Sequence, residues 1–269
     1  HCIPIPNEKK LKNFYIKKFY NLKRKKDYFK NGIENKKWWN KLYTQRLILF
    51  EKLLKKKGKL LDVGSGPGFF LAEAKKRGWN VKGIEPSIDA INFSHSIGVK
   101  EAIKGDIDDL KNFKEKFDLI YVNGVMEHLP NPKKFIEMAN KILVKNGLLF
   151  FWVANDFNFF QYLSLSKTKK PWWIIPPEHI NYFQTESLKK LFDKKKFNLE
   201  YFNTTFPMEL FILMGKNYIK FSKLGKESHK MRQTFELNFD NTNFLKKFYQ
   251  NFSKQNLGRA IEIIVRKKT

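Results

Sequence analysis

Cysteine is nearly absent from this sequence of 269 residues, in which Cys2 is the only one. A single cysteine excludes an internal disulfide framework and a cysteine-rich zinc site within these residues. Long apolar stretches are missing too, since runs such as residues 148–154 fall well short of the roughly 20 residues that a membrane span needs. No basic start leads into an apolar signal segment. The sequence therefore predicts a cytoplasmic protein without a transmembrane segment.

Arginine is scarce although the chain is strongly basic. Lys and Arg total 53 against 26 acidic residues, a formal net charge of +27, and only six of the 53 are arginine. Recognition of phosphates and bases relies on the forked guanidinium group of arginine. The lysines are scattered, and Asn, Phe and Ile are abundant, as an AT-rich genome would produce. Nucleic acid is therefore not the expected partner, while contact of the basic surface with an anionic membrane stays open.

Short apolar runs alternate with helical patterns through the middle of the chain. Strands are predicted at 59–63, 80–85, 99–104, 117–122 and 148–153, and helices at 69–77, 87–97 and 132–144. Strands that alternate with helices indicate right-handed βαβ units and a parallel sheet. The sequence therefore predicts an α/β fold with helices on both faces of the sheet.

The regions on either side of this alternation have a different character. Residues 1–57 form a basic, helical segment rich in aromatic side chains, and residues 58–269 form the α/β domain. Within that domain, five regions follow the fifth strand. They are an aromatic cap at 155–184, a helix at 185–195 with Thr185 as its N-cap, a strand at 197–206, a helical insertion at 207–256 and a strand at 259–267.

A glycine-rich turn follows the first predicted strand and precedes a helix. Its small residues let the backbone turn sharply and let a ligand approach closely. Asp62 lies just before the turn, and Glu85 ends the next strand, where a carboxylate can accept hydrogen bonds from two ribose hydroxyls. Dinucleotide enzymes share this geometry, but their pattern is G-x-G-x-x-G. Here the third glycine, Gly68, comes one residue early, so an NAD enzyme is the least favoured alternative.

Two further strand ends carry motifs, Lys104-Gly105-Asp106-Ile107 and Asn123-Gly124-Val125. With these motifs the chain resembles the class I S-adenosylmethionine-dependent methyltransferases over about residues 46–200. The resemblance implies S-adenosylmethionine as cofactor. It also implies a Rossmann-like sheet of seven strands in the order 3-2-1-4-5-7-6, with an antiparallel last strand.

The same resemblance implies which residues bind the cofactor. The glycine-rich turn would wrap its methionine part, Glu85 would bind the ribose and Asp106 would frame the adenine. Arg46 would approach the carboxylate, although an arginine on a helix surface is an equal interpretation. The full set is Arg46, Asp62, Gly64, Ser65, Gly66, Gly68, Glu85, Pro86, Asp106, Ile107, Asn123 and Val125.

A finer resemblance concerns the acceptor. The segment Pro177-Glu178-His179-Ile180-Asn181-Tyr182-Phe183 is similar to a methyltransferase group common beside sugar- and surface-polysaccharide-modifying genes. This implies a small-molecule acceptor, a sugar or glycan precursor. That group often carries an N-terminal cysteine cluster, of which this chain has Cys2 alone, so no metal is predicted. The alternatives are a quinone or lipid-intermediate O-methyltransferase, an RNA methyltransferase, and a binding module that has lost turnover.

Three residues are candidates for catalysis. A base is needed only if the acceptor must lose a proton, and histidine suits this because it titrates near neutral pH. By the resemblance to sugar methyltransferases, Glu178 and His179 in the cap would act together as the base. His128, after the fourth strand, would lie close to the transferred methyl group. The alternatives are structural: His179 would tie the cap to the core, and His128 would cap its loop.

Overall fold

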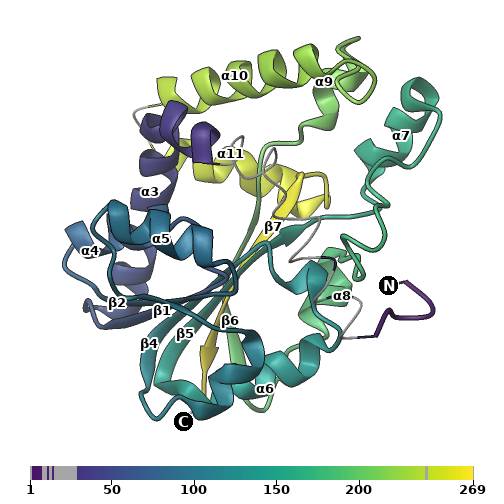
Figure 1. Ribbon diagram of the computed structural model, residues 1–269. Coiled ribbons are helices and arrows are strands. Elements are labelled where there is room, and N and C mark those ends of the chain that lie inside the picture. The colour runs from purple at the N-terminus through teal and green to yellow at the C-terminus, as the bar shows by residue number, and fades with distance from the viewer. Residues whose placement is uncertain (1, 8–10, 12–13, 15–28, 240–241, 269) are drawn as a thin grey trace.

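A single seven-stranded sheet forms the centre of the computed structural model, which describes residues 2–7, 11, 14, 29–239 and 242–268 (Figure 1). The strand order is β3-β2-β1-β4-β5-β7-β6. Strands β1 to β5 pair in parallel, and β7 pairs antiparallel with both β5 and β6. The predicted fold and strand order are therefore confirmed. The strands are β1 (Lys59–Val63), β2 (Asn80–Glu85), β3 (Ala102–Lys104), β4 (Phe117–Asn123), β5 (Leu143–Ala154), β6 (Phe197–Thr204) and β7 (Ala260–Lys267).

Helices cover both faces of the sheet because successive strand residues point to opposite faces. Leu60 packs with residues of α3, α4 and α5, whereas its neighbour Leu61 packs with residues of α6, α8 and the short helix η2. The helices on the first face are α3 (Lys36–Leu54), α4 (Phe69–Lys76) and α5 (Ile88–Ser96). Those on the second face are η2 (Ile107–Asn112), α6 (Pro132–Ile142) and α8 (Thr185–Lys189).

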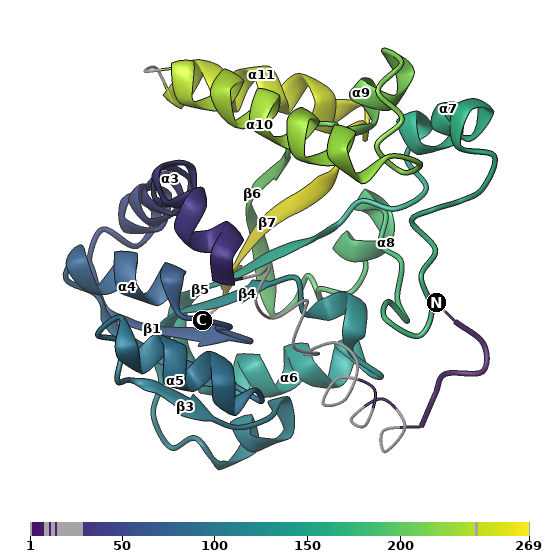
Figure 2. The same ribbon diagram turned by 45° about the horizontal axis from the view of Figure 1, so that its top comes forward.

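Further helices lie beyond the carboxyl ends of the parallel strands (Figures 1 and 2). The cap contains α7 (Phe159–Thr168), and the predicted insertion before the last strand contains α9 (Glu209–Leu213), α10 (Ser222–Asn238) and α11 (Thr242–Lys254). Helix α10 is fastened to α3, since Nζ of Lys41 donates to the main-chain oxygens of Glu236, Leu237 and Phe239 at distances of 2.7 to 3.0 Å. The insertion is thus held over the edge at which an α/β sheet binds ligands.

Several predicted boundaries need correction. The third strand begins at Ala102 rather than residue 99. Helix α8 ends at Lys189 rather than residue 195, and its N-cap is Gln184 rather than Thr185. The hydroxyl of Thr185 instead donates to the side chain of Asn256 at 2.5 Å, so a tertiary contact replaces the expected cap. In the N-terminal segment, residues 8–10, 12–13 and 15–28 lie outside the described part of the chain.

Among the described residues, no helix combines the length and the apolar character required to cross a membrane.

Candidate active site

The glycine-rich turn joins β1 to α4 with a left-handed backbone at three positions. The φ angles of Gly64, Gly66 and Gly68 are +73°, +52° and +76°. A Cβ atom at Gly64 would lie 2.7 Å from Cγ2 of Val125, and one at Gly68 would lie 2.4 Å from Oγ of Ser94. The positive φ angles and the lack of space for a Cβ atom therefore both require glycine at Gly64 and Gly68. Without side chains, the backbone of the turn stays open to a ligand.

The Glu85 carboxylate holds this turn in place from the end of β2. Glu85 is 1% exposed, and its Oε2 accepts a hydrogen bond from the amide of Gly66 at 2.9 Å. Its Oε1 accepts one from the amide of Ser87, also at 2.9 Å, beyond Pro86. Burial, and then the charge of Glu85, raise the pKa of Asp62 well above its ordinary value. Asp62 and Glu85, the two acidic residues that the sequence placed at the ligand site, therefore lie together beside the turn.

The residues predicted to frame an adenine lie next to Glu85. The amide of Gly105 donates to the main-chain oxygen of Glu85 at 3.1 Å, which brings the end of β3 beside the end of β2. Asp106 caps the helix η2 through the amide of Ile107 at 2.6 Å. The exposed Asp106 side chain thus stands at the rim of the site.

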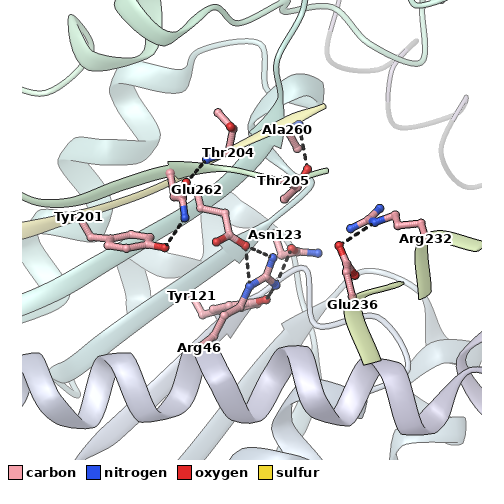
Figure 3. A network of polar contacts seen from close by, with 11 residues as sticks. Arg46, Tyr121, Asn123, Tyr201, Thr204, Thr205, Arg232, Glu236, Ala260 and Glu262 are labelled. Carbon is pink, nitrogen blue, oxygen red and sulfur yellow. Dashed lines mark hydrogen bonds and ion pairs between the residues drawn. The ribbon is translucent and has the colours of Figure 1, made fainter. Parts of the chain in front are cut away.

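Arg46 is the centre of a buried polar network between α3 and the sheet (Figure 3). Its Nε and Nη2 donate to one oxygen of Glu262 at 3.0 and 2.6 Å, and its Nη1 donates to the hydroxyl of Tyr121 at 2.5 Å. Nη1 also lies 3.4 Å from Oδ1 of Asn123 at the end of β4. Burial by itself would lower the pKa of Arg46, but Tyr121 and Glu262 offset this and raise it. Arg46 is 5% exposed, so the interpretation as a helix-surface arginine is wrong.

A small cavity adjoins this network on the side that faces the insertion. It has a volume of about 70 Å³ and lies between α3, the insertion helices and the ends of β6 and β7. Arg46 and Glu262 line it from the sheet side, and Glu236, Arg232 and Tyr249 line it from the insertion. Figure 3 shows the Arg232–Glu236 pair facing the Arg46 network across this space. Side chains of the insertion therefore come close to the end of β4.

The two histidines proposed for catalysis lie together at the opposite side of β4. The ring centroids of His128 and His179 are 5.1 Å apart. Nδ1 of His128 hydrogen bonds to the main-chain oxygen of Glu178 at 2.6 Å, which ties the cap to the loop after β4. Burial lowers the pKa of His128. Burial, together with the nearby His128 ring, lowers the pKa of His179 to about 4.

Two buried carboxyl groups at this site were missed by the sequence reasoning. Glu127, one residue before His128, is 2% exposed, and its Oε1 accepts the amide of Ala154 at 2.8 Å. Burial raises the pKa of Glu127 to about 7. Asp156, two residues beyond β5, is also 2% exposed, and burial raises its pKa to about 7 although Arg259 opposes this. The available signal for Glu127 was an acidic residue four positions after the end of the apolar strand β4.

A missed ion pair joins the insertion to the residue that precedes β7. Nη1 of Arg259 donates to Oε1 of Glu209 at 2.8 Å, and its guanidinium carbon lies 4.5 Å from the ring centroid of Trp172. The Glu209 side chain is fully buried.

Among the residues described, no three His, Cys, Asp or Glu side chains lie close enough together to hold a metal ion.

The family is settled by a match to the model described as "Methyltransferase domain", which covers residues 37–201. The chain belongs to this methyltransferase family. The prediction of a methyltransferase is therefore confirmed at the level of the family, and S-adenosylmethionine is the cofactor of such enzymes.

Curated relatives include ubiquinone biosynthesis O-methyltransferases. That of Coxiella burnetii is 29% identical over 141 residues, which are 47% of this chain and 60% of the relative. That of Actinobacillus pleuropneumoniae is 30% identical over 107 residues, 36% of this chain and 46% of the relative. The match thus spans about half of each protein.

Among solved structures, the fold is similar to that of the plantazolicin methyltransferase BpumL. Its complex with a pentazolic desmethylPZN analog and SAH has a TM-score of 0.60 and 16% identity, covering 98% of this chain and 100% of that chain. A SAM-dependent methyltransferase from Archaeoglobus fulgidus has a TM-score of 0.51 and 18% identity, covering 85% of this chain and 94% of that one. At these identities the likeness concerns the fold.

Proposed function

We propose that this protein transfers the methyl group of S-adenosylmethionine to a small-molecule acceptor, a sugar or glycan precursor. The observation that carries the methyl-transfer part is the turn from Gly64 to Gly68 with the buried Glu85 beneath it. An open backbone loop beside a carboxylate at the end of the second strand suits a nucleoside-bearing ligand. The sugar part rests on the cap segment around His179.

The residues that would hold the cofactor fit it by their chemistry. The turn at Gly64 has no room for side chains, and the Glu85 carboxylate is oriented by two main-chain amides. Glu85 would accept the ribose hydroxyls, Asp106 and Ile107 would border the adenine, and Asn123 would face the methionine part. Arg46 would position Asn123 through its 3.4 Å contact. When bound, S-adenosylmethionine supplies a methyl group already activated by its sulfonium.

The protein's own contribution to the chemistry is to place the acceptor, exclude water and take up a proton where needed. The low pKa of His179 keeps its ring neutral at pH 7. Its Nδ1 is buried, and no described residue offers it a hydrogen bond. That nitrogen can therefore accept a hydrogen bond from an acceptor hydroxyl and orient it, whereas a pKa of about 4 makes the ring a weak base at pH 7. His128 would position the Glu178 and His179 segment through its bond to the Glu178 carbonyl.

A second candidate is O-methylation of a quinone precursor. The names of the curated relatives favour it. These relatives match only part of the chain, which leaves much of the molecule without a counterpart in the alignment.

Calorimetric titration with S-adenosylhomocysteine and with NAD tests the cofactor. Wild type is expected to bind S-adenosylhomocysteine and not NAD. Glu85→Ala is expected to weaken binding at least about 100-fold, because two hydrogen bonds to a charged group are lost. The exposed Glu186 provides the control, and Glu186→Ala should bind as wild type. Binding of NAD in place of S-adenosylhomocysteine would contradict the proposal. A screen of nucleotide sugars against catechols then separates the two acceptor classes.

A further inference from the structure

Helix α7 in the cap carries its apolar side chains on the outside of the molecule. Phe159, Tyr162 and Leu163 are 62%, 52% and 41% exposed, and their spacing of three and four residues places them on one face of the helix. The opposite face is polar and yet buried, since Gln161 is 1% and Ser164 0% exposed. A surface helix of a globular protein normally has the reverse arrangement. Packing within the described part of the chain therefore does not explain the outer face of α7.

Two more exposed apolar side chains lie in the segment that follows α9. Helix α9 packs against α7 (Figure 2), and Nδ2 of Asn217 donates to the main-chain oxygen of Lys167 at 3.0 Å, which holds this segment beside the end of α7. Met214 and Phe221 in the segment are 67% and 52% exposed. Exposed apolar patches on a soluble protein mark interaction sites. The outer patch, as we call it, consists of Phe159, Tyr162, Leu163, Met214 and Phe221.

The two segments that carry the outer patch are rich in lysine and contain no acidic residue. Residues 157–177 include three lysines, residues 210–226 include four, and neither range contains Asp or Glu. An acidic neighbour comes only from beyond these ranges, where Glu227 forms an ion pair with Lys216 at 3.8 Å. The surroundings of the outer patch therefore have a clear excess of positive charge.

Lysines lie at the end of the apolar face of α7. Lys167 follows Leu163 by one helical turn, so that both side chains lie on the same side of the helix. Lys169 and Lys170 come directly after the helix, and all three lysine side chains are exposed. Apolar and cationic side chains are thus presented together to whatever covers this face.

This combination suits the surface of an anionic lipid bilayer. Phe, Tyr and Leu side chains enter the boundary between head groups and acyl chains, and each lysine close to an anionic surface strengthens binding about fivefold. A nucleic acid fits less well, because Leu163 and Met214 can neither stack on bases nor bind phosphate. Neither segment contains arginine, the residue best suited to phosphate and base recognition. The chemistry of the patch therefore favours a membrane surface.

We propose that the outer patch and its lysines dock this protein on an anionic lipid bilayer. The contact is peripheral, since α7 has ten residues and a membrane span needs roughly 20. The inference goes beyond the proposed function and does not depend on it.

Docking through α7 would bring the cap side of the molecule to the bilayer. Nε1 of Trp172 donates to Oγ of Ser164 at 3.5 Å, on the buried face of α7. The ring of the same tryptophan lies against Arg259, whose guanidinium carbon is 4.5 Å from the ring centroid. The inner face of α7 is thus connected to the residues under the cap, while its outer face would contact lipid. Acceptors held in the bilayer would then be presented to the cap side of the enzyme.

Co-sedimentation of the full chain with lipid vesicles tests this proposal. One set of vesicles is pure phosphatidylcholine, and the other is an equimolar mixture of phosphatidylcholine and phosphatidylglycerol. We expect the protein to bind the mixed vesicles at least about tenfold more tightly than the neutral ones. Added salt should weaken this binding because it screens the lysines.

Two double variants divide the outer patch into its apolar and its charged part. Phe159→Ser with Leu163→Ser removes two exposed apolar side chains, and Lys169→Glu with Lys170→Glu reverses two exposed charges. Each double variant should bind the mixed vesicles at least about tenfold more weakly than wild type.

Matched controls make the same changes elsewhere on the surface. Ile48→Ser with Leu199→Ser removes two side chains that are 49% and 53% exposed on α3 and β6. Lys194→Glu with Lys195→Glu reverses two exposed charges just before β6. Both controls should stay within about threefold of wild type. All the substituted side chains are exposed, so unchanged thermal unfolding is expected and shows that the variants are folded.

Three outcomes would overturn the proposal. The first is equal binding of wild type to neutral and mixed vesicles, or no binding to either. The second is an equal loss in the two lysine variants, which would mean that net charge alone attracts the protein. The third is a loss in the Lys169 and Lys170 variant without one in the Phe159 and Leu163 variant, which would indicate a soluble anion such as an acidic polypeptide. None of these outcomes bears on the methyltransferase function, which S-adenosylhomocysteine binding tests.

Discussion

Glu85 and Glu127 are both buried carboxyl groups near the carboxyl ends of parallel strands, yet their surroundings differ. Both oxygens of Glu85 accept hydrogen bonds from main-chain amides, those of Gly66 and Ser87. Glu127 has one such bond, from Ala154, and its second oxygen has no partner among the described residues. The Glu85 carboxylate beside the glycine-rich turn is thus oriented by the chain itself. The Glu127 carboxyl group under the cap is oriented through one oxygen only.

Arg46 joins α3 to β4 and β7 on the cofactor side, and its removal should have the largest effect. Arg46→Ala leaves Glu262 as an unpaired, nearly buried carboxylate, which costs about 3–5 kcal/mol of unfolding free energy. Urea denaturation measures this. The partly exposed pair Arg77–Glu51 is the control, and Arg77→Ala should cost about 1 kcal/mol or less. Similar losses in both variants would show that the buried Arg46–Glu262 pair contributes no more than an exposed ion pair.

The pH dependence of stability should distinguish the carboxyl groups under the cap next. The folded-state pKa of Glu127 and of Asp156, at about 7, lies above the ordinary values of 4.5 and 3.8. The unfolded chain therefore loses these protons first, and stability falls as pH rises from about 4 to about 7. Glu127→Gln removes one of the two titrating groups. The loss of unfolding free energy over this pH range should therefore be about 1–3 kcal/mol smaller than in wild type.

Urea denaturation of wild type and Glu127→Gln at pH 5 and pH 8 provides the measurement. The control is Glu186→Gln, which should keep the wild-type dependence because Glu186 is exposed. A dependence in Glu127→Gln as steep as in wild type would mean that Glu127 ionises normally.

The smallest expected effect comes from a matched pair of helix caps. The Ser87 hydroxyl accepts the amide of Ala90 at 3.3 Å on the cofactor side, and Asn158 accepts the amide of Gln161 at 3.0 Å under the cap. Ser87→Ala should cost about 1 kcal/mol. Asn158→Ala should cost about 1 kcal/mol more, because the buried Asn158 side chain also donates to the carbonyl of Asn155 at 2.8 Å. Thermal unfolding of both variants compares them, and an equal loss would show that the second bond adds nothing.

The predictions from sequence succeeded where the determining residues are close together. The alternation of strands and helices, the turn at Gly64 to Gly68 and the acidic Glu85 depend on period, backbone freedom and spacing, all of which are local properties. One boundary error arose from a tertiary contact. Thr185 follows the sequence pattern of an N-cap, but its hydroxyl donates a hydrogen bond to the side chain of Asn256, 71 residues away.

The sequence by itself determined the parallel sheet, the strand that carries the glycine turn and the carboxylate opposite it, because buried strands and tight turns have few alternatives. Only the tertiary structure decided which polar side chains meet. Arg46 pairs with Glu262, which lies 216 residues away in the sequence, and Arg259 pairs with Glu209, which lies 50 residues away. A buried charge must be paired, but nothing local specifies its partner. The packing of the cap and the insertion on the sheet makes that choice, and with it the chemistry of the acceptor side.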